Sequence, residues 1–152
     1  MTRVESLKNI LPIIFPKFYT LFTPDMHELV FLDCGERLKA TSKDKDTGIL
    51  ISKYLDSDKT QCEAVQNHIH IFRKINPKDV DNVTQIGMSI ANNLIDNLKY
   101  HFPKKKFIVY LEVNAKDTTI IRFHQVWENE PQYFDIKSFK YKNVEIYEFT
   151  VN

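Results

Sequence analysis

The segment 78–101 constrains the fold more than any other part of this sequence, because its apolar residues recur at helical intervals. The repeating positions are Val83, Gly87, Ile90, Leu94 and Leu98. Steps of three and four residues place these positions on one face of an α-helix, and such a face needs a core to pack against. We expect Gly87 to let this helix approach a sheet closely and Pro103 to end it.

The residues after this helix alternate between apolar and polar, as β-strands with one buried face do. In the range 107–114 the odd positions form the apolar face, and the range 118–127 follows after a short connection. Such a connection predicts an antiparallel hairpin. Further strands are expected at 28–33, 48–55, 68–75 and 143–151, with 37–41 extending the pairing of the first and 56–60 forming a turn.

The N-terminal range 2–22 contains Pro12 and Pro16, and it predicts a short helix, a break and a second helical turn. Together the elements predict an α+β fold, with an antiparallel sheet of about five or six strands. The long helix and the N-terminal helical segment are expected to pack on this sheet. Because the chain has no internal repeat, low-complexity tract or linker, residues 1–152 are expected to form one domain.

The composition excludes several classes of function. Lys and Arg number 21 against 20 Asp and Glu, so the chain lacks the positive excess that nucleic-acid binding usually requires. With only three glycines, it has no glycine-rich phosphate-binding loop. Cys34 and Cys62 form no disulfide framework, and the apolar run 10–16 is too short and proline-interrupted for an export signal or a membrane span. We therefore expect a cytoplasmic protein without a membrane partner.

The most informative segment for function is 120–134. On a strand, Arg122 and His124 project to the same side, where Glu112 of the preceding strand could pair with them. Aromatic and acidic side chains follow. We predict an outward-facing partner-binding surface that consists of Arg122, His124, Trp127, Glu128, Glu130 and Tyr133. The alternative is the ordinary polar face of a strand, with an Arg122–Glu112 ion pair worth about 0.2–1 kcal/mol.

Two further patterns could support other chemistry. His68 and His70 stand two apart on a predicted strand, and with His124 or Glu112 they could bind Zn, Fe or Ni. Surface histidines beside a core strand are the alternative. The basic run 104–106 could contact phosphates, or it could complement the dipole of the preceding helix. No nucleophile motif surrounds any cysteine or serine, so no catalytic residue and no cofactor is predicted.

The residues IRFHQ at 121–125, followed by ENEPQY at 128–133, resemble a segment of small bacterial immunity proteins of polymorphic toxin systems. The resemblance implies a cytoplasmic protein that binds a cognate toxin domain and blocks its active site, with no reaction of its own. Inhibitors of nucleases are often acidic, so the balanced charge of this chain implies a local acidic patch or a toxin of another kind. A metal-binding protein or metal-dependent enzyme that uses His68, His70 and His124 is the alternative hypothesis.

Overall fold

The computed structural model describes residues 3–34, 43–115, 117–138 and 143–152. The helices are α1 (Arg3–Ile14), α2 (Tyr54–Ser57), α3 (Lys59–Gln66) and α4 (Val80–His101), and a short 3-10 helix (Pro77–Asp79) leads into α4. The strands are β1 (Phe18–Phe22), β2 (Glu28–Leu32), β3 (His68–Arg73), β4 (Phe107–Asn114), β5 (Thr118–Gln125) and β6 (Val144–Val151).

The six strands form two antiparallel sheets, so the predicted α+β class is confirmed. A four-stranded sheet has the order β3-β5-β4-β6, and β1 pairs with β2 in a separate two-stranded sheet. The predicted hairpin of β4 and β5 is present, with Leu111 opposite Ile121 and Tyr110 opposite Arg122. This register places β5 between two neighbouring strands and therefore makes it an interior strand.

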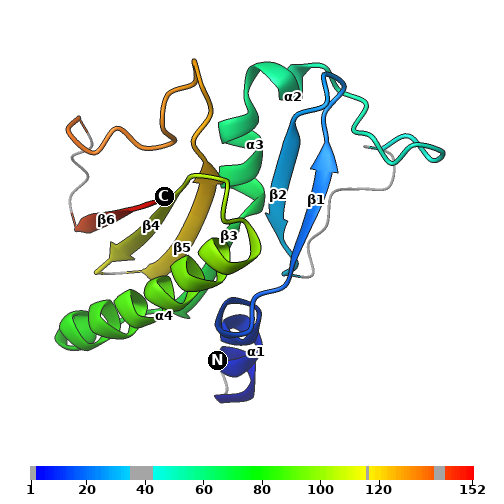
Figure 1. Ribbon diagram of the computed structural model, residues 1–152. Coiled ribbons are helices and arrows are strands. Elements are labelled where there is room, and N and C mark those ends of the chain that lie inside the picture. Colours follow the sequence, from blue (N-terminus) through cyan, green and yellow to red (C-terminus); the bar gives the residue numbers. More distant parts are fainter. Residues whose placement is uncertain (1–2, 35–42, 116, 139–142) are drawn as a thin grey trace.

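The apolar face of α4 packs on one face of the four-stranded sheet (Figure 1). Leu94 and Leu98 are fully buried in the same core as Leu111 and Phe123. The helix approaches the sheet closely at Gly87, where a Cβ atom would lie 2.8 Å from Cδ1 of Leu111. The expected role of Gly87 is thus confirmed, because a side chain at this position would require Leu111 to move.

Helix α3 lies between the four-stranded sheet and the β1–β2 hairpin (Figure 1). The inner edge of β2 faces this helix. Side chains form hydrogen bonds with the backbone groups of β2 along that edge. Asn67 accepts from the Leu32 N–H at 2.8 Å and donates to the Val30 carbonyl at 2.8 Å. Glu63 accepts from the Val30 N–H at 2.9 Å, and Gln125 donates to the Glu28 carbonyl at 2.9 Å. Polar side chains thus join the two sheets where strand pairing would otherwise occur.

Three local predictions were wrong. The range 18–22 is strand β1 rather than a helical turn, because it pairs along its full length with β2. The range 48–55 contains an isolated bridge at Leu50 and the start of α2, not a strand, and the predicted turn at 56–60 contains the end of α2 and the start of α3. The predicted extension at 37–41 falls outside the described residues.

None of the helices in the described ranges combines the length and the apolar character that a membrane crossing requires.

Candidate partner-binding site

Arg122 and His124 do not face solvent, and this part of the predicted surface is wrong. Arg122 is 9% exposed and His124 is 1% exposed. The segment that follows β5 returns across the second face of the sheet and covers both side chains. The guanidinium of Arg122 lies 4.9 Å from the ring centre of Tyr133 and 5.9 Å from that of Phe134. The polar alternation of β5 therefore marks an interior layer under aromatic cover.

Arg122 is held by a largely buried ion pair with Glu112. Its Nε donates to Glu112 at 2.9 Å, and its Nη1 donates to the Ala64 carbonyl at 2.9 Å. The predicted Arg122–Glu112 pair is thus present, although in the interior rather than on the surface. Burial raises the pKa of Glu112 even though the charge of Arg122 and its hydrogen bond lower it. Removing one member of such a pair leaves the other charge without compensation.

His124 is buried in the same interior layer, where both of its ring nitrogens have hydrogen-bond partners. Its Nδ1 lies 2.7 Å from the Gln125 carbonyl, and its Nε2 lies 3.2 Å from the Tyr110 hydroxyl and 3.3 Å from the Tyr133 amide nitrogen. Burial lowers the pKa of His124, which favours a neutral ring that donates from Nδ1 and accepts at Nε2. Both ring nitrogens are therefore engaged. Within the described ranges, no three His, Cys, Asp or Glu side chains are grouped so as to hold a metal ion.

Glu63 of α3 is fully buried and accepts hydrogen bonds from several elements. Its donors are the Val30 N–H at 2.9 Å, the Gln125 N–H at 3.2 Å, the Gln125 amide at 2.8 Å and the Trp127 indole N–H at 2.6 Å. Burial raises the pKa of Glu63 to about 7, and these hydrogen bonds oppose the shift. One carboxyl group thus connects the β1–β2 sheet, the central strand β5 and the segment that begins at Trp127.

The raised pKa of Glu63 predicts a pH-dependent stability. The folded state keeps the Glu63 proton up to about pH 7, whereas the unfolded chain releases it near the ordinary pKa of 4.5. The folded state therefore binds more protons in this interval, and the free energy of unfolding falls as pH rises. Between about pH 5 and pH 8 we expect this group to contribute a loss of about 2–3 kcal/mol.

Urea denaturation across this pH range measures the effect, with Glu63→Gln as the comparison because it has no titrating group at position 63. The stability of the wild type should fall relative to that of the variant as pH rises. Parallel stability curves would contradict the prediction.

An open cavity of about 570 Å³ lies where the segment after β5 meets α2, α3 and the β1–β2 turn. The residues that line it are His27, Asp56, Ser57, Lys59, Trp127, Glu128, Asn129 and Glu130. Three residues of the predicted surface therefore lie together here, namely Trp127, Glu128 and Glu130. Tyr133 lies instead on the second face of the four-stranded sheet, over Arg122.

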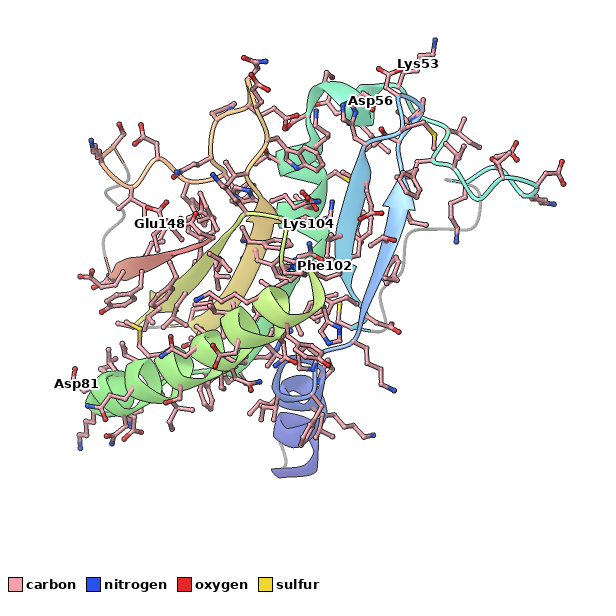
Figure 2. The ribbon with its side chains drawn as sticks, in the orientation of Figure 1. Lys53, Asp56, Asp81, Phe102, Lys104 and Glu148 are labelled. Atoms are coloured by element: carbon pink, nitrogen blue, oxygen red, sulfur yellow. The ribbon has the colours of Figure 1, made fainter. Side chains whose placement is uncertain are left out.

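His27 and Asp56 form a dyad at this cavity. Asp56 lies on α2 beside the β1–β2 hairpin (Figure 2), and its Oδ1 is 2.8 Å from Nδ1 of His27. The hydroxyl of Thr23 donates to the same oxygen. Burial disfavours the charged form of Asp56, but the hydrogen bonds from Thr23 and His27 outweigh it and lower the pKa of Asp56. The dyad fixes the imidazole with its edge against Trp127, at 5.9 Å between ring centres.

Lys59 and Glu130 form an ion pair in the lining of the cavity. Nζ of Lys59 lies 2.6 Å from Glu130 and 5.1 Å from the centre of the Trp127 ring. Glu130 also accepts from the Thr60 N–H at 2.8 Å, so the N-terminal end of α3 is tied to the segment after β5. Hydrogen bonds from Lys59 and Thr60 outweigh burial and lower the pKa of Glu130. Glu130 therefore remains a carboxylate, while the neighbouring Glu128 is exposed to solvent.

No pattern in the sequence indicates that His27, Asp56 or Lys59 belongs to this site. His27 and Asp56 are 29 residues apart, and no local motif surrounds either. Their convergence requires the β1–β2 turn, α2 and the start of α3 to meet, and α3 itself was not predicted. Only the Trp127–Glu130 side of the cavity could be recognised from composition.

No curated protein matches this chain. No solved structure matches it either. Residues 24–148 match the profile described as the uncharacterized protein PM0498 family. This range includes every residue that lines the cavity. Because the match spans most of the chain, the protein belongs to the uncharacterized protein PM0498 family.

Proposed function

We propose that this protein is a protein-binding module, specifically an immunity-type inhibitor that binds and neutralises a cognate bacterial toxin domain in the cytoplasm. The cavity lined by Trp127, Glu128 and Glu130 is the proposed contact site. The proposal assigns no reaction to the protein itself. It rests on the resemblance of residues 121–125 and 128–133 to immunity proteins, and on the chemistry of this cavity.

The observation that carries the proposal is the local excess of negative charge. Three carboxylates line the cavity, from Asp56, Glu128 and Glu130, against the single ammonium group of Lys59. Glu130 binds that ammonium at 2.6 Å, so Glu128 has no matching cation among the lining residues. A chain of balanced total charge thus presents an acidic site. Such a site suits a partner surface rich in Arg or Lys.

Exposed apolar side chains flank the lining residues in sequence. Met26 precedes His27, Tyr54 lies one turn before Ser57, and Val126 precedes Trp127. They are 56%, 66% and 48% exposed, respectively. Apolar and aromatic groups beside charged ones are typical of protein-binding sites, in which a few desolvated anchors provide most of the affinity.

The buried layer beneath the cavity supports this use because it fixes the binding residues before a partner arrives. The indole N–H of Trp127 bonds to Glu63, and Glu130 is fixed by Lys59 and Thr60. A site held in one conformation loses little side-chain entropy on binding. In this proposal Arg122 and His124 act as positioning residues, since they hold the segment that forms the contact site.

Growth protection tests the proposal. A candidate toxin domain, chosen from the reading frames that neighbour this gene, is expressed in a bacterial host with the wild-type chain or with Glu128→Lys. Glu128 is exposed and makes no contact that supports the fold in the described structure, so its charge can be reversed without disturbing Glu63. We expect the wild type to restore growth and Glu128→Lys to lose at least about 30-fold in affinity, or about 2 kcal/mol.

Asp96→Lys is the matched control, because Asp96 is an exposed carboxylate on α4 and does not line the cavity. It should protect as the wild type does. Failure of the wild type to protect would refute the immunity role, and equal protection by both variants would refute the assignment of the cavity. Alanine substitution of Trp127 or Glu130 is a weaker test, because both side chains also hold the fold.

A further inference from the structure

The two histidines of β3 line a second, smaller cavity. It measures about 160 Å³ and lies between α1 and β3. Its lining residues are Lys8, Pro12, Cys34, His68, Ile69, His70 and Arg73. None of them belongs to the cavity beside Trp127. The function proposed above therefore leaves this cavity without a role.

The imidazole rings of His68 and His70 are held in fixed orientations. Their ring centres are 5.6 Å apart. Nδ1 of His68 lies 2.6 Å from the Val65 carbonyl, which can only accept a hydrogen bond. Nδ1 of His70 lies 3.1 Å from the Thr118 hydroxyl, whose proton goes to the Phe72 carbonyl at 2.7 Å. Both rings thus donate from Nδ1, and among the described residues no hydrogen-bond partner lies at Nε2 of either ring.

The charge around these rings favours an anion over a metal cation. Lys8 and Arg73 line the cavity, and no carboxylate is among the described residues that line it. Burial lowers the pKa of His70, and the positive charges of Arg73, His68 and Arg122 lower it further, whereas Asp117 opposes them. Among the neighbouring acids, Glu112 is paired with Arg122. Lys8 and Arg73 repel a cation here and attract an anion, whose negative charge would in turn favour the protonated imidazoles that can donate to it from Nε2.

We propose that this cavity binds a phosphate group through Lys8, His68, His70 and Arg73. The cavity is too small for a nucleotide or another large ligand, so the phosphate enters it while the rest of a phosphate ester remains outside. Basic side chains that line one small cavity can provide the hydrogen bonds that phosphate oxygens accept. The histidine pair that suggested a metal site in the sequence is thereby reassigned to anion binding.

Titration of the full chain with inorganic phosphate tests the site. NMR spectra monitor the ring resonances of the histidines at about pH 6.5, near the ordinary imidazole pKa. We expect saturable shifts at His68 and His70. His27 and His101 lie outside the cavity and serve as internal references. Sodium chloride at matched ionic strength is the parallel titration and should leave all four rings unchanged.

Arg73→Gln removes one lining charge at an exposed position and should weaken phosphate binding about 10-fold, which corresponds to the loss of one charge-assisted hydrogen bond. Lys104→Gln is the matched control, since Lys104 is exposed in the connection after α4. Equal phosphate affinity in the two variants would overturn the assignment. The same conclusion would follow if chloride reproduced the shifts or if the reference histidines shifted equally.

Vesicle sedimentation distinguishes the two sources of such a phosphate. Phosphatidylcholine vesicles are compared with vesicles that also contain phosphatidic acid. One result is that the wild type sediments only with the vesicles that contain phosphatidic acid, while Arg73→Gln sediments with neither kind. This result would support the site and assign the phosphate to a lipid headgroup. Phosphate binding without sedimentation would support the site and assign it to a soluble phosphate ester.

Discussion

Glu63→Leu should lower the free energy of unfolding by more than about 4 kcal/mol, because it leaves buried N–H donors without an acceptor and each such donor costs about 1–3 kcal/mol. Val30, Gln125 and Trp127 all donate to the Glu63 carboxyl group. Leucine has a similar volume but no acceptor. Urea denaturation followed by circular dichroism measures the loss, which is a large part of the stability of a typical domain.

Gln61→Leu is the matched control for this substitution. Gln61 lies on the same helix with its side chain exposed, and its change to leucine should alter stability by less than about 0.5 kcal/mol. Where Glu63→Leu does not fold at all, Glu63→Gln provides a milder test, since it keeps one acceptor oxygen. A loss of less than about 1 kcal/mol in Glu63→Leu would show that Glu63 does not join the two sheets.

Arg122→Met should cost up to about 3–5 kcal/mol, because it leaves the largely buried Glu112 carboxylate without its partner. The Ala64 carbonyl also loses its donor. The double substitution Arg122→Met and Glu112→Met removes both charges and should recover most of this loss. Chemical denaturation of the two single variants and the double variant gives the coupling between the two side chains.

This double substitution also separates structure from binding. In our proposal Arg122 does not touch the partner, so a stable double variant that keeps the cavity intact should still bind. Additive losses in the three variants would contradict a buried ion pair. Loss of partner binding in a stable double variant would instead show that Arg122 is needed to position the segment after β5.

Regular spacing of apolar residues predicts only those helices and strands whose buried side chains are apolar. Helix α4 and the β4–β5 hairpin follow from their spacing, because each buries one apolar face. Helix α3 was not predictable in this way, since it buries Lys59, Thr60 and Glu63 as well as Ala64. Its contacts join distant elements through hydrogen bonds, and a polar buried face gives no hydrophobic period.

The candidate site was predictable only in part. Trp127, Glu128 and Glu130 follow one another closely, so their aromatic and acidic character is visible in the sequence. The alternation of polar residues along β5 predicts that Arg122 and His124 face outward, whereas Tyr133 and Phe134 fold back and cover them. Aromatic cover from a segment without regular structure leaves no period in the sequence.

Hydrogen exchange of the backbone amides tests the central claim most directly, measured on the protein alone and in complex with a toxin domain that the growth assay identifies as its partner. It requires no substitution, so a loss of stability cannot be mistaken for a loss of contact. We predict slower exchange on binding in residues 126–130 and in the β1–β2 turn beside His27, with α4 unchanged. Slower exchange confined to α4, with no change around Trp127 and His27, would contradict the proposed binding site.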